Sequence, residues 1–261
     1  MAGALPIITY HHVTPIEDDR VTVSLIHFQA QMAYLYHQGF TTLSLKELLM
    51  ILEGSRPLPK RPVALTFDDG YRDNYRFAYP ILKKYGFKAT IFVVTGWMAE
   101  NRTGSPPEQI VSHQQCWDLI HQGRAAEIAL TWPEAREMEE SGLIRIESHS
   151  HTHSKNLYQD PPALKENLKI SQETFLTHLK RTSSALCWPG GRYNEQSLDL
   201  ARELGFRSCC TVERGLNRPG SDPFRLKRVT VKDAGPRWLK KTLFIFSNPW
   251  LGSFYAKIKP K

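Results

Sequence analysis

Short runs of β-type residues alternate with longer helical stretches along most of this chain, and no other feature constrains its fold as strongly. Strands that are joined by helices run parallel, because each helix carries the chain back to the edge where the strand began. The strands that we predict are Ile7–Tyr10, Val63–Phe67, Ala89–Val94, Ile144–Glu147, Ala185–Trp188, Arg207–Thr211 and Lys227–Val231. The predicted helices are Phe28–His37, Leu45–Glu53, Asn74–Tyr85, Trp132–Ser141, Leu164–Lys180 and Glu195–Leu204. About seven strand–helix units indicate an α/β fold, a distorted and incomplete (β/α)7 barrel rather than a flat doubly wound sheet.

A single domain accounts for residues 1–235, because a chain of 261 residues is long enough for one substantial core. Residues 97–130 fit no strand–helix unit, so we predict an insertion with one short helix, Cys116–Gln122. Insertions after barrel strands commonly shape a substrate groove. Residues 236–261 are predicted to form a basic, aromatic C-terminal tail.

The expected setting is the reducing cytoplasm. The N-terminal segment lacks the basic and apolar regions of a signal peptide, and no window approaches the roughly 18 apolar residues of a membrane span. The four cysteines include an adjacent pair and no CxxC spacing, so neither a disulfide scaffold nor a zinc knuckle is indicated.

Positive charge is concentrated near the C-terminus. Residues 225–261 contain ten Lys and Arg residues and one acidic residue, whereas the rest of the chain is nearly neutral. A nucleic-acid-binding domain usually carries its basic residues over a whole face. We therefore expect no nucleic-acid partner.

Polar residues follow several of the predicted strands, at the barrel end where catalytic groups normally lie. They are His11 and His12, Asp68 and Asp69, the segment His149–His153, and Pro189–Gly191. Adjacent carboxylates at a strand end point in opposite directions, so one can bind a cation while the other accepts a proton. Asp-Asp-Gly is also ordinary turn chemistry, and that interpretation stays open for Asp68 and Asp69.

Three histidines within five residues, at 149, 151 and 153, are more specific. Imidazole is a standard ligand of Zn²⁺, and histidines four residues apart on a helical turn face one way. Two imidazoles and one carboxylate leave coordination positions open, as in hydrolytic sites. A surface histidine cluster is the competing interpretation.

The segments Thr66–Gly70 (TFDDG), His149–His153 (HSHTH) and Trp188–Asn194 (WPGGRYN) resemble the motifs of the polysaccharide deacetylase family, also called the NodB-homology or carbohydrate esterase 4 family. The similarity extends over about residues 6–231. It is greatest to the branch that deacetylates poly-β-1,6-N-acetylglucosamine and related N-acetylhexosamine substrates. The resemblance implies a barrel of the NodB-homology type and removal of an N-acetyl group.

Carried over residue by residue, the resemblance implies that Asp68 is the general base and that Asp69, His149 and His153 bind a divalent cation. We expect Zn²⁺ ahead of Co²⁺ or Ni²⁺. The cation would polarise the attacking water, Asp68 would take its proton, and the backbone N–H of Gly190 would stabilise the oxyanion.

This chain departs from the family pattern at three places. The usual large side chain after the third-motif proline is replaced by Gly190, so Trp188 and Tyr193 become candidate substrate contacts. The arginine that pairs with the base has no counterpart at Leu186 or Cys187. The late Leu-x-His that supplies the general acid in many members is missing. We therefore assign the acid to His11, with His12 as the rival and a buried structural histidine as the alternative.

Two interpretations of the tail remain open. Aromatic residues beside lysines suit an anionic membrane surface, in which case a lipid-linked amino sugar at the inner face of the cytoplasmic membrane becomes a better substrate than exported polymer. A final helix that packs on the barrel with a solvated basic face explains the same residues.

Two other functions compete with deacetylation. A catalytically silent sugar-binding module would lack Asp68 or a metal ligand, and this chain keeps all of them. A metal-dependent hydrolase of another C–N or ester bond, such as a cyclic imide, remains the alternative.

Overall fold

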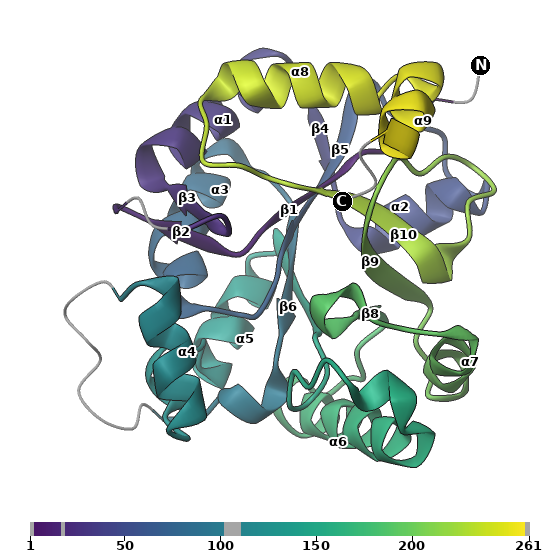
Figure 1. The fold of residues 1–261 in the computed structure, drawn as a ribbon. Helices are drawn as coiled ribbons and strands as arrows, with labels where there is room; N and C mark the ends of the chain where they lie inside the picture. The colour runs from purple at the N-terminus through teal and green to yellow at the C-terminus, as the bar shows by residue number, and fades with distance from the viewer. Residues whose placement is uncertain (1–2, 17–18, 102–110, 259–261) are drawn as a thin grey trace.

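The computed structural model describes residues 3–16, 19–101 and 111–258. Within these residues, seven parallel strands form a closed ring (Figure 1). They are β1 (Ile7–Tyr10), β5 (Pro62–Phe67), β6 (Ala89–Val93), β7 (Ile144–Ser148), β8 (Ala185–Cys187), β9 (Ser208–Arg214) and β10 (Leu226–Thr230). The ring closes because β1 pairs with β5 on one side and with β10 on the other.

The predicted (β/α)7 barrel is confirmed, and its distortion is local. Between β7 and β8 a single residue pair, Ser148 and Leu186, is in register. Between β9 and β10 the register shifts at a bulge. The ring is nevertheless closed, so the barrel is distorted rather than open.

Three short strands were not predicted. β4 (Thr41–Leu43) pairs with the first half of β5, and β2 (His12–Thr14) pairs with β3 (Thr22–Ser24) beside the barrel. Each has three residues, which is too short for a period of two to stand out from its surroundings.

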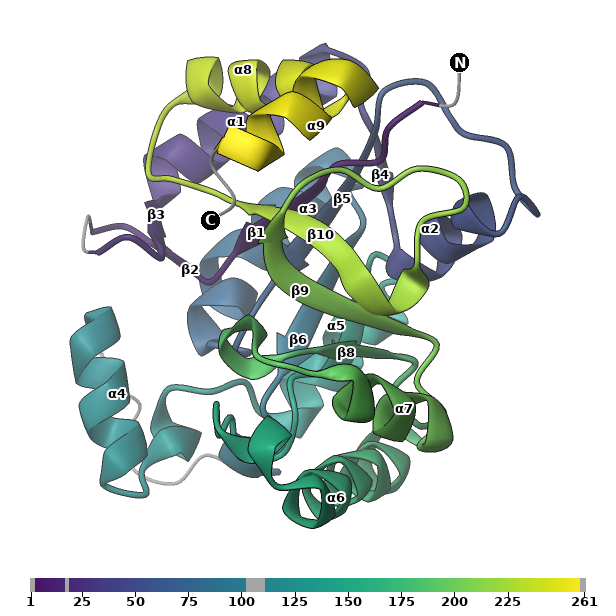
Figure 2. The same cartoon turned by 45° about the vertical axis from the view of Figure 1, so that its right-hand side comes forward.

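Helices surround the ring, as Figure 1 and Figure 2 show from two directions. They are α1 (Leu25–His37), α2 (Leu45–Leu52), α3 (Tyr79–Tyr85), α5 (Trp132–Glu140), α6 (Pro161–Leu179) and α7 (Glu195–Glu203). Thr131 and Glu134 form the capping box that starts α5.

The helix predicted over Asn74–Tyr85 was wrong in its first half. Residues Asn74–Ala78 form a π-helical turn, and the α-helix begins only at Tyr79. Pro80 has no N–H to donate to the carbonyl of Arg76, so a regular α-helical ladder cannot pass through this point. The predicted stop at Gly86 holds, with φ of 65°.

Two cores support the barrel. Val63, Leu65 and Phe67 of β5 face outwards into an apolar layer beneath the helices. Ala64 belongs to a second cluster that includes Ile7 and Phe92 and fills one end of the ring. At the other end the inward residues become polar, and Thr66 Oγ1 lies 2.9 Å from Thr9 Oγ1. The functional groups lie directly beyond this polar layer.

The insertion contains α4 (His113–His121), which begins three residues earlier than predicted because Ser112 and Gln115 form a capping box. Residues 102–110 of the predicted insertion lie outside the described residues.

The C-terminal segment forms α8 (Pro236–Phe246) and α9 (Pro249–Ile258). Leu239, Leu243 and Phe246 of α8 join the apolar layer around the barrel. In the described part of the chain, no helix is both long and apolar enough to span a bilayer.

Candidate active site

Asp69, His149 and His153 come together at the polar end of the barrel. Nε2 of His149 and Nε2 of His153 each lie 3.3 Å from Oδ1 of Asp69. All three side chains are buried, and their ligand atoms lie within 4.8 Å of one another. One carboxylate and two imidazoles suit a divalent cation, and a fourth position stays available for substrate or water.

A turn rather than a helix aligns the two histidines, so the helical spacing assumed from the sequence was wrong. Ser150 and His153 have φ of 70° and 59°, and the segment has no helical hydrogen-bond pattern. The Ser150 hydroxyl accepts a bond from the His153 N–H at 3.1 Å. Backbone strain of this kind is typical of functional sites.

The His149 ring is oriented for metal binding through its other nitrogen. Its Nδ1 lies 2.7 Å from the carbonyl oxygen of Cys187, to which an Nδ1–H would donate. Nε2 is left for the Asp69 side, where it would give up its proton and offer its lone pair to a cation, as is usual for metal-binding histidines. Burial would raise the pKa of Asp69, but hydrogen bonds from His149 and His153 hold it well below its ordinary value. The donor set therefore fits a divalent cation.

Gly70 lets β5 pass close to β6 immediately after the two aspartates. A Cβ at this position would lie 3.1 Å from the backbone Cα of Val93, and the φ of Gly70 is 73°. Only glycine meets both conditions without displacing the strand.

Asp68 points to a different partner, the guanidinium of Arg228 on β10. Arg228 Nη1 donates to Oδ1 and Nη2 donates to Oδ2, both at 2.7 Å, in a fully buried bidentate pair. The same arginine donates from Nε to the carbonyl of Thr211 at 2.8 Å and contacts the Cys187 sulfur at 3.0 Å. Burial would raise the pKa of Asp68, but the charge and hydrogen bonds of Arg228 outweigh it and lower the pKa.

Arg228 was missed by sequence reasoning, which looked for this arginine at Leu186 and Cys187. One signal was available in the sequence. Arg228 lies two residues after Leu226, so on a strand both side chains face the barrel interior, where an arginine needs a charged partner. Only the closed ring, in which β10 lies two strands from β5, shows that it reaches Asp68.

The two candidate acids have different surroundings. His11 Nε2 lies 3.9 Å from Asp68 Oδ2, and its side chain is 21% exposed. His12 is buried and turned towards the insertion, with Nδ1 2.6 Å from Asp73 and Nε2 3.0 Å from His113 Nδ1. Of the two, His11 therefore lies beside Asp68, and His12 connects the barrel to α4.

A scan against protein-family models matches residues 55–209 to the polysaccharide deacetylase family. The chain belongs to this family. The Bacillus subtilis protein YxkH is 31% identical over 227 residues, which cover 87% of this chain and 71% of that protein. A poly-β-1,6-N-acetyl-D-glucosamine N-deacetylase of Staphylococcus aureus is 26% identical over 220 residues, covering 81% of this chain and 68% of the relative.

Solved structures of similar proteins have the same architecture. The Streptococcus pyogenes deacetylase PplD, solved in complex with acetate, superposes with a TM-score of 0.77 at 26% identity, covering 93% of this chain and 99% of PplD. IcaB from Ammonifex degensii has a TM-score of 0.73 at 24% identity, covering 92% of this chain and 96% of IcaB.

The third motif of this deacetylase differs from the sequence-based expectation. The Trp188 ring is buried and stacks on Tyr193 at a centroid distance of 6.0 Å, so it offers no open stacking face. The Tyr193 hydroxyl donates to Glu213 at 2.6 Å. Gly190 has φ of 60°, and a Cβ there would lie 3.3 Å from the side chain of Lys155. Glycine suits this left-handed conformation, and Lys155 occupies space beside it.

Two tryptophans border the metal ligands, and neither was predicted. The rings of Trp97 and Trp117 lie 5.3 Å and 5.5 Å from the His153 ring. Lys155 Nζ lies 5.6 Å from the Trp117 ring centre. Trp117 belongs to α4, so the insertion does contribute a wall beside the candidate centre.

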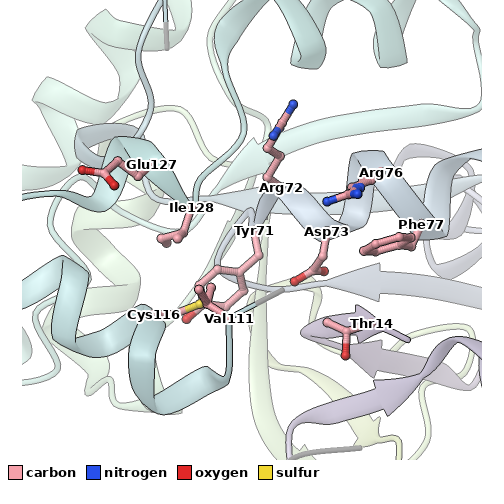
Figure 3. Close-up of a pocket in the computed structure, with 10 residues that line it drawn as sticks. All are labelled: Thr14, Tyr71, Arg72, Asp73, Arg76, Phe77, Val111, Cys116, Glu127 and Ile128. Atoms are coloured by element: carbon pink, nitrogen blue, oxygen red, sulfur yellow. The ribbon is translucent and has the colours of Figure 1, made fainter. Parts of the chain in front are cut away.

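A small cavity lies beside the centre, between α4 and the barrel (Figure 3). Its volume is about 60 Å³, and Figure 3 shows Tyr71 reaching towards Val111 and Cys116, with Asp73 and Arg76 on another side. Ligand pockets usually measure about 300–1,000 Å³, so this cavity is too small for a hexosamine. Its lining includes none of Asp69, His149 and His153.

Replacing Arg228 by Met should leave Asp68 buried without its charge partner. We expect the pKa of Asp68 to rise. The acidic limb of the pH–rate profile should then move to higher pH, because Asp68 becomes protonated and inactive sooner as the pH falls. Because an unpaired buried charge is costly, the free energy of unfolding should also drop by about 3–5 kcal/mol. A pH–rate profile and a denaturant titration measure the two effects.

Arg225→Met is the matched control for Arg228→Met. Arg225 lies three residues away, is 37% exposed and pairs with Glu195 at the surface. The Arg225→Met variant should therefore have the same acidic limb of the pH–rate profile as the parent chain. An unshifted acidic limb in Arg228→Met would show that the arginine does not govern Asp68.

Proposed function

We propose that this chain is a metal-dependent N-deacetylase of an N-acetylhexosamine, in a glycan or a lipid-linked sugar of cell-envelope or lipopolysaccharide biosynthesis. One observation carries the proposal: two adjacent aspartates have separate partners. Asp69 meets His149 and His153, while Asp68 is held by Arg228 outside that ligand set. Metal-assisted hydrolysis of an amide uses a cation site and an ionised base of this kind side by side.

A divalent cation at Asp69, His149 and His153 would supply Lewis acidity, polarising the acetyl carbonyl and lowering the pKa of the attacking water. Zn²⁺ suits this donor set, and Co²⁺ or Ni²⁺ could replace it. Asp68 accepts the proton of the attacking water, because each carboxylate oxygen keeps a lone pair after binding Arg228. The N–H of Gly190 is proposed to donate to the oxyanion that forms on the carbonyl.

His11 is proposed as the general acid. An expelled amide anion is far too basic, so the leaving nitrogen must receive a proton as the C–N bond breaks. His11 Nε2, 3.9 Å from Asp68 and partly exposed, is placed to deliver it, and the products are acetate and a free amine.

Substituting His11 by Ala should lower the turnover number by about 10²- to 10⁴-fold, the usual contribution of a positioned acid, with metal content unchanged. An acetate-release assay measures the turnover number of the purified variant, and metal analysis measures its metal content. His12→Ala is the control and should retain much more activity, because His12 is bonded to Asp73 rather than to the site. Near-normal turnover of His11→Ala would remove it from the mechanism.

Acetate release distinguishes the possible substrates. The metal-replete protein should release acetate from β-1,6-linked N-acetylglucosamine oligomers or from a lipid-linked N-acetylhexosamine. The name of the Staphylococcus aureus relative supports the first class. Hydrolysis of a cyclic imide or a simple ester, with no acetate from either sugar, would replace this proposal by a hydrolase of another bond.

A further inference from the structure

The outer face of helices α8 and α9 exposes large apolar side chains. On α9 these are Trp250, Leu251, Phe254 and Ile258, with exposures of 82%, 40%, 66% and 60%, and on α8 Phe244 is 68% exposed. Figure 1 and Figure 2 both draw the two helices together at one end of the molecule. We call these five residues the apolar face.

This apolar face is not the surface by which α9 attaches to the protein. Gly252 is buried on the opposite side, where a Cβ would lie 2.5 Å from Leu216 and 3.2 Å from the carbonyl oxygen of Ile245. Tyr255, on the same side, packs edge-on against Phe246 with ring centres 5.9 Å apart. The helix is therefore docked through its small and aromatic inner residues, and Trp250 and Phe254 point away from the fold.

Positive charge lies beside the apolar face on α8. Arg237, Lys240 and Lys241 are exposed on α8 at positions that share a side with Phe244. The sequence from Ala234 to Lys261 contains no acidic residue. Such a combination of aromatic and basic residues suits an anionic, partly apolar surface and disfavours a neutral or basic partner.

A cavity of about 160 Å³ lies between the two helices and the barrel, and its lining is also cationic. Arg214, Lys232 and Lys241 line it together with Trp238 and Tyr255. Within the described ranges, none of the three cations has an ion-pair partner. Clustered unpaired cations repel one another, so an anionic group placed among them would be stabilised.

We propose that the apolar face docks on an anionic phospholipid bilayer, with Trp250 and Phe254 at headgroup depth. A tryptophan ring favours the interface because its N–H edge is hydrated while the rest of the ring is apolar, and Phe254 adds apolar area beside it. The neighbouring cations select anionic over neutral lipid. This surface is independent of the proposed deacetylation, although it would hold the enzyme beside a lipid-linked sugar.

Co-sedimentation with vesicles tests the proposal. The full chain should bind vesicles of mixed phosphatidylcholine and phosphatidylglycerol, bind phosphatidylcholine alone weakly, and be released by high salt. Trp250→Ser/Phe254→Ser should weaken binding by about tenfold or more, because it removes most of the buried apolar area. Lys240→Glu/Lys241→Glu should abolish the preference for anionic lipid.

Leu176→Ser is the matched control, since Leu176 of α6 is 55% exposed and lies outside the apolar face. It should bind vesicles like the parent chain. All variants should keep their unfolding temperature and their acetate release from a soluble substrate, so a failure of vesicle binding is distinguishable from a failure of the proposed function.

Equal vesicle binding by all variants, or no binding by the parent chain, would overturn the proposal. Self-association that the Trp250→Ser/Phe254→Ser variant abolishes, without vesicle binding, would assign the apolar face to a second copy of the chain instead.

Discussion

Replacing Asp68 by Asn should lower the turnover number for acetate release by about 10²- to 10⁴-fold, with bound metal unchanged. The amide keeps the size of the side chain but cannot accept the proton of the attacking water. Asp68 is paired with Arg228 at 2.7 Å, while Asp69 lies 3.3 Å from both His149 and His153. The cation site should therefore survive the change.

Metal analysis and steady-state kinetics on the same preparation decide the outcome. Because Asp68→Asn leaves Arg228 buried without a charged partner, it should also lose stability, and a buried-carboxylate control is needed. Glu147→Gln serves, since Glu147 is 2% exposed and bonds Ser183 and Ser184 away from the site. It should lose stability and keep its rate per folded molecule. Loss of metal together with activity in Asp68→Asn would make Asp68 a ligand rather than a base.

Removing the cation, or replacing His153 by Ala, should reduce acetate release by about 10³-fold or more, because Lewis acidity contributes several kcal/mol and each 1.36 kcal/mol is tenfold in rate. His153 lies 3.3 Å from Asp69 and has no equivalent substitute within the ligand set. Chelation should abolish activity, and re-addition of Zn²⁺, Co²⁺ or Ni²⁺ should restore it. In His153→Ala, the purified protein should contain little metal, and added metal should not rescue the rate.

His151→Ala provides a control from the same segment. His151 Nδ1 lies 3.0 Å from the Thr95 hydroxyl, and His151 does not belong to the group formed by Asp69, His149 and His153. We expect this variant to keep its metal and most of its turnover. A His153→Ala protein that bound metal stoichiometrically and worked at the normal rate would contradict the proposed centre.

The residues of the candidate centre could be predicted because they lie close together in sequence or directly after strands. Asp69 lies just beyond the end of β5, and His149 directly follows β7. All strands of such a barrel direct their carboxyl ends to one face, so residues from different strand ends must meet there. The strand–helix alternation was equally visible, because it depends on local hydrophobic patterns of roughly four to eighteen residues.

Residues whose role depends on the other strands could not be predicted. Arg228 reaches Asp68 only because β1 pairs with both β5 and β10 and so brings β10 to the same interior. His11 and His12 are neighbours in sequence, yet one lies beside Asp68 and the other bonds Asp73 and His113. Trp188 is a residue type that often stacks on sugars, but its side chain is buried within the fold.

The sequence by itself determined the barrel class, the family, and that Asp69, His149 and His153 come together. Only the tertiary structure decided which arginine holds Asp68, which histidine stands beside it, and that the basic tail is two helices with an exposed apolar face. Sequence motifs predict the spacing of neighbouring residues and the end of the barrel at which each strand stops. The closure of the ring and the packing of helices upon it are long-range, and they set which side chains share an interior.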